Sequence, residues 1–111
     1  VNELVKEVVS DIIHRHVQFP EGTLVTITRA ECSPDLHYAN IFVTVFSPDK
    51  TGHKEAVSRL RSGVREIQYE LNRALRMRPV PRIAFVVDEE EEKRERVEEL
   101  LAEDRRNNNR S

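Results

Sequence analysis

Two strands joined by a tight turn are predicted by residues 25–45, which read VTITRAECSPDLHYANIFVTV. The first part is rich in β-branched residues, so we expect a strand over residues 23–32. Ser33-Pro34-Asp35 has turn chemistry, and the alternation that follows predicts a second strand over residues 37–46. The strands are close enough in sequence to pair as an antiparallel hairpin. The buried face of the second strand is assigned to Ala39, Ile41, Val43 and Val45.

Helical periodicity is present on both sides of this hairpin. Apolar residues recur at steps of three and four over residues 2–17, which predicts an amphipathic helix. The same period returns over residues 53–76 and predicts a longer helix. Gly63 lies in its middle, where a glycine costs about 1 kcal/mol relative to alanine, so we expect a kink there. Two prolines end this helix, and alternating apolar residues then predict a last strand over residues 82–87.

Length and composition indicate one small α+β domain. The chain has 111 residues, 38% of them hydrophobic and 34% charged, with a formal net charge of −2. A domain of this size uses most of its apolar residues in one core, so a large buried active-site cavity is not expected. No run approaches the roughly 18 apolar residues of a membrane span, and no signal segment precedes the first helix, although the start at Val1 suggests trimming. Cys32 is the single cysteine, which excludes an intramolecular disulfide and a four-thiolate metal site and suits a reducing compartment.

The composition changes after Asp88. Residues 89–111 are mostly charged, with too little apolar surface to order independently, although they could form a helix that frays or docks weakly. The last part, residues 105–111, has the composition of a disordered segment. We therefore expect a folded domain over residues 1–88 and an acidic, flexible C-terminal tail over residues 89–111.

The formal net charge is close to zero, but acidic and basic residues are concentrated in different parts of the chain. Residues 1–53 carry 7 acids and 4 bases, or −3, and residues 54–82 carry 3 acids and 8 bases, or +5. Residues 88–106 carry 10 acids and 5 bases, or −5. A basic segment bracketed by acid indicates an anionic ligand. The alternative is a solvated helix face without a ligand.

The second half of the long helix separates its polar residues into two flanks. Projected at 100° per residue, arginines and amides gather on one flank, whereas Glu66, Glu70 and Arg73 occupy the other. Guanidinium forks and amides suit phosphates and base edges. Arg61 would join the first flank if the helix continued straight through Gly63. The candidate nucleic-acid-binding residues are Arg61, Arg65, Gln68, Asn72, Arg76 and Arg78.

The sequence gives no support for an enzyme, a cofactor or a metal site. His14 and His16 are two residues apart and point to different sides of a helix, whereas metal ligands on a helix favour a spacing of four. Neither a P-loop nor a dinucleotide-binding glycine motif is present. The carboxylates of residues 88–92 lie in a segment expected to be exposed to water, where strongly shifted pKa values are not expected.

Over residues 24–45 and 59–101 the chain strongly resembles the bacterial ribosome-binding factor A family. Leu60 to Leu75 is similar to the family's long helix, and residues 77–85 are similar to the segment that leads into its last strand. The family's turn motif, Ser-Pro-Asp-Leu followed by an aromatic residue and alanine, is matched by Ser33, Pro34, Asp35, Leu36, Tyr38 and Ala39.

The resemblance implies a KH-like fold of the type II arrangement. Its order is helix, strand, strand, kinked helix, strand, with a three-stranded sheet and the helices on one face. In the family the Gly-x-x-Gly nucleic-acid loop of KH domains is replaced by a kink centred on Ala-x-Gly. Here the corresponding residues are Arg61, Ser62 and Gly63, so the glycine matches and the alanine does not.

The resemblance also implies a function without catalysis. Family members bind small-subunit ribosomal RNA on free, immature small subunits, support late maturation and cold adaptation, and act in the cytoplasm or in an organelle with bacterial-type ribosomes. A ribosome-dependent GTPase assists their release, and no membrane is involved. We expect a monomer with the same function. The family's basic stretch before the first helix is missing here. The alternative hypothesis is a protein-interaction module that acts through its acidic tail.

Overall fold

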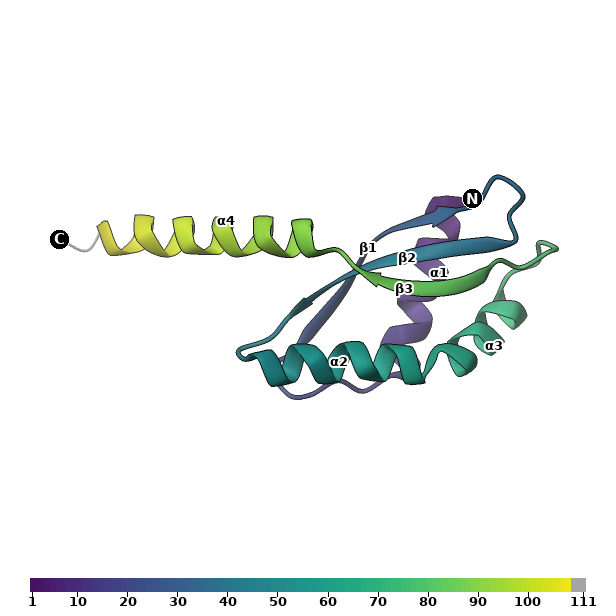
Figure 1. The fold of residues 1–111 in the computed structure, drawn as a ribbon, viewed down its shortest axis with the longest axis horizontal. Helices are drawn as coiled ribbons and strands as arrows, with labels where there is room; N and C mark the ends of the chain where they lie inside the picture. The colour runs from purple at the N-terminus through teal and green to yellow at the C-terminus, as the bar shows by residue number, and fades with distance from the viewer. Residues whose placement is uncertain (109–111) are drawn as a thin grey trace.

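The computed structural model describes residues 1–108 and confirms the type II KH-like order of elements (Figure 1). A three-stranded sheet is covered on one face by three helices, and a fourth helix leads away from it. The elements are α1 (Asn2–His16), β1 (Leu24–Cys32), β2 (Tyr38–Phe46), α2 (Lys50–Ser62), α3 (Val64–Ala74), β3 (Arg82–Val87) and α4 (Glu89–Asn108).

The sheet has the order β1-β2-β3. β1 and β2 form the predicted antiparallel hairpin, with Val25 opposite Val45 and a bulge at Thr28. β3 pairs with β2 in parallel, with Tyr38 opposite Arg82. A parallel pair requires a crossover connection, and α2 and α3 provide it on the face where they pack.

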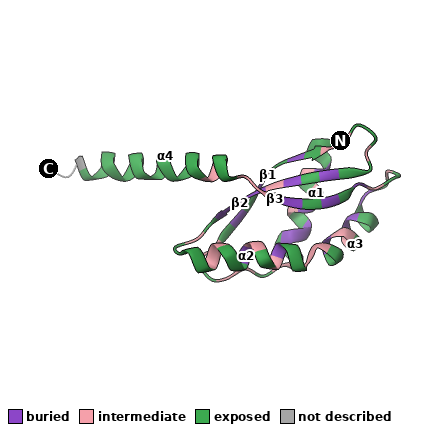
Figure 2. Ribbon diagram, in the orientation of Figure 1, coloured by how far each residue is buried: buried purple, intermediate pink, exposed green. Residues whose placement is uncertain are grey.

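The core lies between this sheet and helices α1, α2 and α3 (Figure 2). All four residues assigned to the buried face of β2 are buried, and Ile41 and Val43 are completely inaccessible. Leu60 of α2 and Ile67 of α3 cover them together with the apolar face of α1. The apolar residues that alternate along the strands and those that recur every three to four residues along the helices therefore pack in one core.

The predicted long helix is two helices, because the chain breaks at Gly63. Its backbone has φ −87° and ψ 2°, which interrupts the helical path between α2 and α3. A Cβ atom at this position would lie 3.1 Å from the carbonyl oxygen of Arg59, a close approach that favours glycine. α2 begins at Lys50, three residues earlier than expected, because the Asp49 carboxylate accepts a 2.7 Å hydrogen bond from the Gly52 backbone N–H.

Residues expected to form a flexible tail are helical as far as Asn108. Asp88 explains the difference: its side chain accepts a hydrogen bond from the Glu91 backbone N–H at 3.1 Å, as an N-cap does. Four glutamates then occupy the first turn, where they complement the helix dipole. The expectation of disorder was thus wrong for residues 105–108, and residues 109–111 lie outside the described part.

α4 is tied to the domain through its first turn. The Glu92 carboxylate accepts a 2.8 Å hydrogen bond from the Val45 backbone N–H and lies 3.0 Å from Nε2 of His53. Asp88 pairs with Arg29 of β1 at 3.9 Å. Beyond these contacts the helix leads away from the body of the domain (Figure 1). Whether residues 89–108 act as a separate unit stays a prediction.

The pKa of Glu95 predicts a pH-dependent gain in stability when its charge is removed. Burial against the domain raises this pKa, and the neighbouring carboxylates of α4 raise it further. A raised folded-state pKa means that the native state favours the protonated form, so ionisation destabilises it as the pH rises through this value. We expect Glu95→Gln to raise the melting temperature at pH 7 and to have no effect at about pH 3, below the unfolded-state pKa. Glu103→Gln, on the same helix but outside this cluster, is the control, and an equal gain from both would contradict the explanation.

Candidate nucleic-acid interface

Helix α2 and the first turn of α3 carry four exposed cations that we call the cationic edge. The three on α2 line a groove with Val86 and Val87 at the end of β3 and with Glu89 of α4. The fourth follows directly after the kink at Gly63, on α3. The cationic edge consists of Lys50, Lys54, Arg61 and Arg65.

The cations of this edge differ from those on the opposite flank by being unpaired. On the opposite flank Arg59 binds Glu55 at 2.7 Å, and Arg73 lies 3.9 Å from Glu70. Within residues 1–108, no ion pair or side-chain hydrogen bond engages the four side chains of the cationic edge. Positive charge exposed to solvent without an internal partner is available to an external anion.

The two central candidates are both exposed, on either side of the break at Gly63, so Arg61 does not join the flank of a straight helix. Arg65 is exposed on α3, and Arg61 is exposed on the last turn of α2, lining the groove. Glu66 and Glu70 lie on the other side, where both approach His16 of α1 at 3.8–4.0 Å. Arg65 and the two glutamates thus lie on α3 as exposed and partly paired side chains, and binding of RNA by the candidate residues stays a prediction.

Gln68 has an internal role that the helical projection did not reveal. Its Nε2 donates to the carbonyl oxygen of Pro81 at 3.0 Å, and its Oε1 accepts from the Ile83 backbone N–H at 2.9 Å. Nε2 also lies 3.0 Å from Oδ1 of Asn72, which is exposed. Its amide therefore joins α3 to the start of β3, and an RNA contact by Gln68 stays an untested prediction.

Arg76 and Arg78 lie outside the helical flank. α3 ends at Ala74, and the buried Leu75 is extended, with φ −88° and ψ 134°, so a projection through residue 76 does not apply. The Arg78 guanidinium donates to the carbonyl oxygens of Leu75 and Met77 at 3.1 and 2.7 Å, which holds its own loop together. Proline at position 79 disfavours helical backbone before it, and this signal shows why the helix could not extend to Arg78.

Replacing Gln68 by leucine tests its structural role. The Pro81 carbonyl and the Ile83 N–H would each lose a partner, so we expect a loss of about 2 kcal/mol in the free energy of unfolding, measured by urea denaturation. Gln18→Leu is the matched control, because the Gln18 side chain is exposed. A loss as small as that of the control would show that α3 and β3 are held by the core alone.

Sequence reasoning missed Lys50 and Lys54. Their spacing of four, continued by Ser58 and Arg61, places them on one side of a helix. The spacing was not recognised because the helix was expected to begin at residue 53, so Lys50 was assigned to a loop. Recognising Asp49 as an N-cap would have found it.

The described residues contain little that suggests chemistry. No group of three or more His, Cys, Asp and Glu side chains in residues 1–108 is arranged to hold a metal ion. Burial raises the pKa of the Cys32 thiol, which lowers its reactivity at neutral pH. None of the helices in this part of the chain is long and apolar enough to cross a membrane.

Comparisons with known proteins agree on one family. The family model described as ribosome-binding factor A matches residues 1–101, and so reaches into α4. Ribosome-binding factor A of Natranaerobius thermophilus is 34% identical over 89 residues, covering 80% of this chain and 67% of that protein. The Clostridium perfringens protein of the same name is also 34% identical over 89 residues, covering 79% and 77%.

Solved structures of the same family share the fold. The crystal structure of ribosome-binding factor A from Thermus thermophilus is similar with a TM-score of 0.63 and 25% identity, covering 77% of this chain and 88% of that one. A Thermus thermophilus model fitted into a cryo-electron-microscopy map of the 30S complex has the same TM-score and coverage at 24% identity.

Proposed function

Because the chain belongs to the ribosome-binding factor A family, we propose that it assists late maturation of the small ribosomal subunit by binding small-subunit ribosomal RNA on free subunits. The observation that carries the proposal is the cationic edge, where four exposed cations on two consecutive helices have no ion pair within residues 1–108. RNA presents a phosphate on every nucleotide, and such a set of cations can hold several of them while the fold reads RNA shape. That the Thermus thermophilus relative was fitted into a map of its 30S complex supports the choice of subunit.

Further parts of the proposal come from the resemblance to the family. The chain acts as a monomeric binding factor without catalytic chemistry, in the cytoplasm or in an organelle with bacterial-type ribosomes. It supports ribosomal RNA processing and growth in the cold, and a ribosome-dependent GTPase assists its release.

Co-sedimentation with free small subunits and with full ribosomes tests the function directly. We expect the chain to bind free small subunits and to bind full ribosomes much more weakly. Because phosphate contacts release counterions, the affinity should fall steeply as salt is raised from about 50 to 200 mM. Equal binding to full ribosomes would contradict a role before translation, and an affinity independent of salt would contradict phosphate contact.

The acidic helix α4 favours a second candidate function, docking on a basic protein. Its apolar side chains Val97, Leu100 and Leu101 are exposed, so they do not contribute to the core. Removing residues 94–111 separates the two functions, because this deletion keeps Glu92 and its contacts with the domain. The RNA-binding proposal expects the shortened chain to bind small subunits as the full chain does, whereas the docking function expects binding to be lost.

A further inference from the structure

We propose that the open face of the sheet binds an unpaired RNA base, as a second contact beside the cationic edge. The inference rests on the proposed function and adds the kind of RNA that is bound: a strand with at least one base free to stack. We call this surface the sheet platform. It consists of Arg29, Tyr38, Asn40, Phe42, Arg82 and Ala84.

The platform lies on the face that helices α1, α2 and α3 leave uncovered (Figure 1). Tyr38 is 60% exposed and stands opposite Arg82 on β3. Two residues along β2, Asn40 stands opposite Ala84, and both are exposed. The small side chain of Ala84 leaves space between larger neighbours, and Asn40 offers a donor and an acceptor there.

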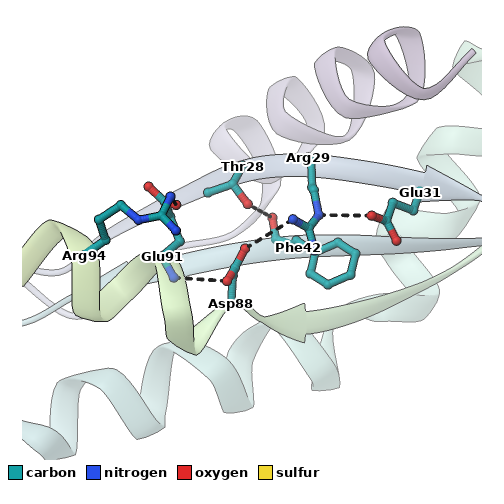
Figure 3. Close-up of polar contacts among 7 residues, drawn as sticks. All are labelled: Thr28, Arg29, Glu31, Phe42, Asp88, Glu91 and Arg94. Atoms are coloured by element: carbon teal, nitrogen blue, oxygen red, sulfur yellow. Dashed lines mark hydrogen bonds and ion pairs between the residues drawn. The ribbon is translucent and has the colours of Figure 1, made fainter.

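Glu31 stands opposite Asn40 on the β1 side, and Arg29, two residues away opposite Phe42, is held in place. Its Cζ lies 4.0 Å from the ring centroid of Phe42. Its Nε lies 3.3 Å from Oε1 of Glu31, and its Nη1 lies 3.9 Å from Oδ2 of Asp88 (Figure 3). Guanidinium groups and aromatic rings are the side chains on which unpaired bases stack, and a group that is already ordered loses little entropy on binding.

An unpaired cation beside an exposed aromatic ring favours RNA as the occupant of the platform. The two acids beside it, Glu31 and Asp88, are both engaged by Arg29. Among the described strand residues of this face, Arg82 is the charged side chain left without an ion pair. The two arginines equal these two acids in number, and the cation left without an internal partner within residues 1–108 is Arg82. The tyrosine opposite it and the amide nearby match the chemistry by which proteins hold single-stranded RNA.

The platform is also connected to the cationic edge. β3 is the edge strand of the sheet, and Gln68 ties α3 to it at Pro81 and Ile83, directly beside Arg82. An RNA strand whose phosphates follow α2 and α3 can thus pass around β3 and place a base on the open face.

An oligoribonucleotide of about ten unstructured nucleotides with a central 2-aminopurine tests the platform, with a hairpin of similar length as the double-stranded probe. We expect the full chain to quench 2-aminopurine fluorescence, since stacking causes quenching. Tyr38→Ala should weaken binding of the single strand about ten-fold and abolish the quenching, and should leave hairpin binding unchanged. Tyr38→Phe keeps the ring and should restore both signals.

Tyr69→Ala is the matched control. Tyr69 is 59% exposed but lies on α3, away from the platform, so its removal should change neither signal. If single-strand binding survives in Tyr38→Ala, the platform is not a base site, and a loss of small-subunit binding by that variant would then indicate a protein contact instead. Failure of the unaltered chain to bind either probe or small subunits would overturn the proposed function itself.

Discussion

Changing Arg61 and Arg65 together to glutamate is expected to lower the affinity for free small subunits about 100-fold at 0.15 M salt. If each arginine contacts one phosphate, the loss of counterion release at this salt concentration accounts for about 30-fold. The two new carboxylates repel the RNA backbone and account for the rest. Binding measured over a salt series should also show a slope of log affinity against log salt that is smaller by about 2.

The control for this variant changes the net charge equally. Arg15 and Arg73 are exposed and lie in ion pairs with Asp11 and Glu70 on other parts of the surface. We expect the Arg15→Glu, Arg73→Glu double variant to lose only the small long-range attraction. If both double variants lose affinity equally, binding depends on total charge, and the cationic edge has no special position in it.

The second large effect is expected from Ile41→Ala in the centre of the sheet. Ile41 is completely buried on the middle strand, between β1 and β3 and under the helices. Removing its side chain loses the transfer free energy of three carbons and leaves a cavity that the neighbouring strands cannot fill. We expect a loss of about 3–4 kcal/mol in the free energy of unfolding, a large part of the roughly 5–15 kcal/mol of a small domain.

Urea denaturation and thermal unfolding would measure this loss. A domain of about this size loses roughly 4–8 °C per kcal/mol, so the melting temperature should fall by about 15 °C or more. Val97→Ala is the control, because Val97 is exposed on α4, and it should stay within about 0.5 kcal/mol of the unaltered chain. A loss below about 1 kcal/mol for Ile41→Ala would mean that the core collapses around the smaller side chain.

The strands could be predicted because their signals are local. Alternation over residues 38–46 places Ile41 and Val43 on one face whatever lies above them, and the Ser33-Pro34-Asp35 turn brings β1 against β2. The kink at Gly63 was also predictable, because a glycine within a helical period is costly unless the backbone needs it. Capping by Asp49 and Asp88 is present in the sequence. Without it the predicted start of α2 was three residues late, and a helix after Asp88 was only an alternative to a flexible tail.

The candidate site was only partly predictable. Helical spacing predicted that Arg65 lies on the polar surface of α3, where it is exposed, whereas the position of Arg61 depended on the kink at Gly63. It did not reveal the internal contacts of Gln68, since an amide on a helix surface has the same sequence signal whether it faces solvent or the backbone of another strand. The helical projection did not apply to Arg76, because α3 ends at Ala74. The next residue, Leu75, has an extended backbone and a buried side chain, which depends on the tertiary packing.

By itself, the sequence of this protein determined the three strands, the first helix, the kinked helix to within a few residues and the place where it bends. These properties depend on intervals of two to four residues along the chain. Only the tertiary structure decided which charges remain free. Pairing depends on residues distant in sequence: His16 approaches Glu66 across α1 and α3, and Arg29 meets Asp88 across the sheet. No spacing within a single element contains that information.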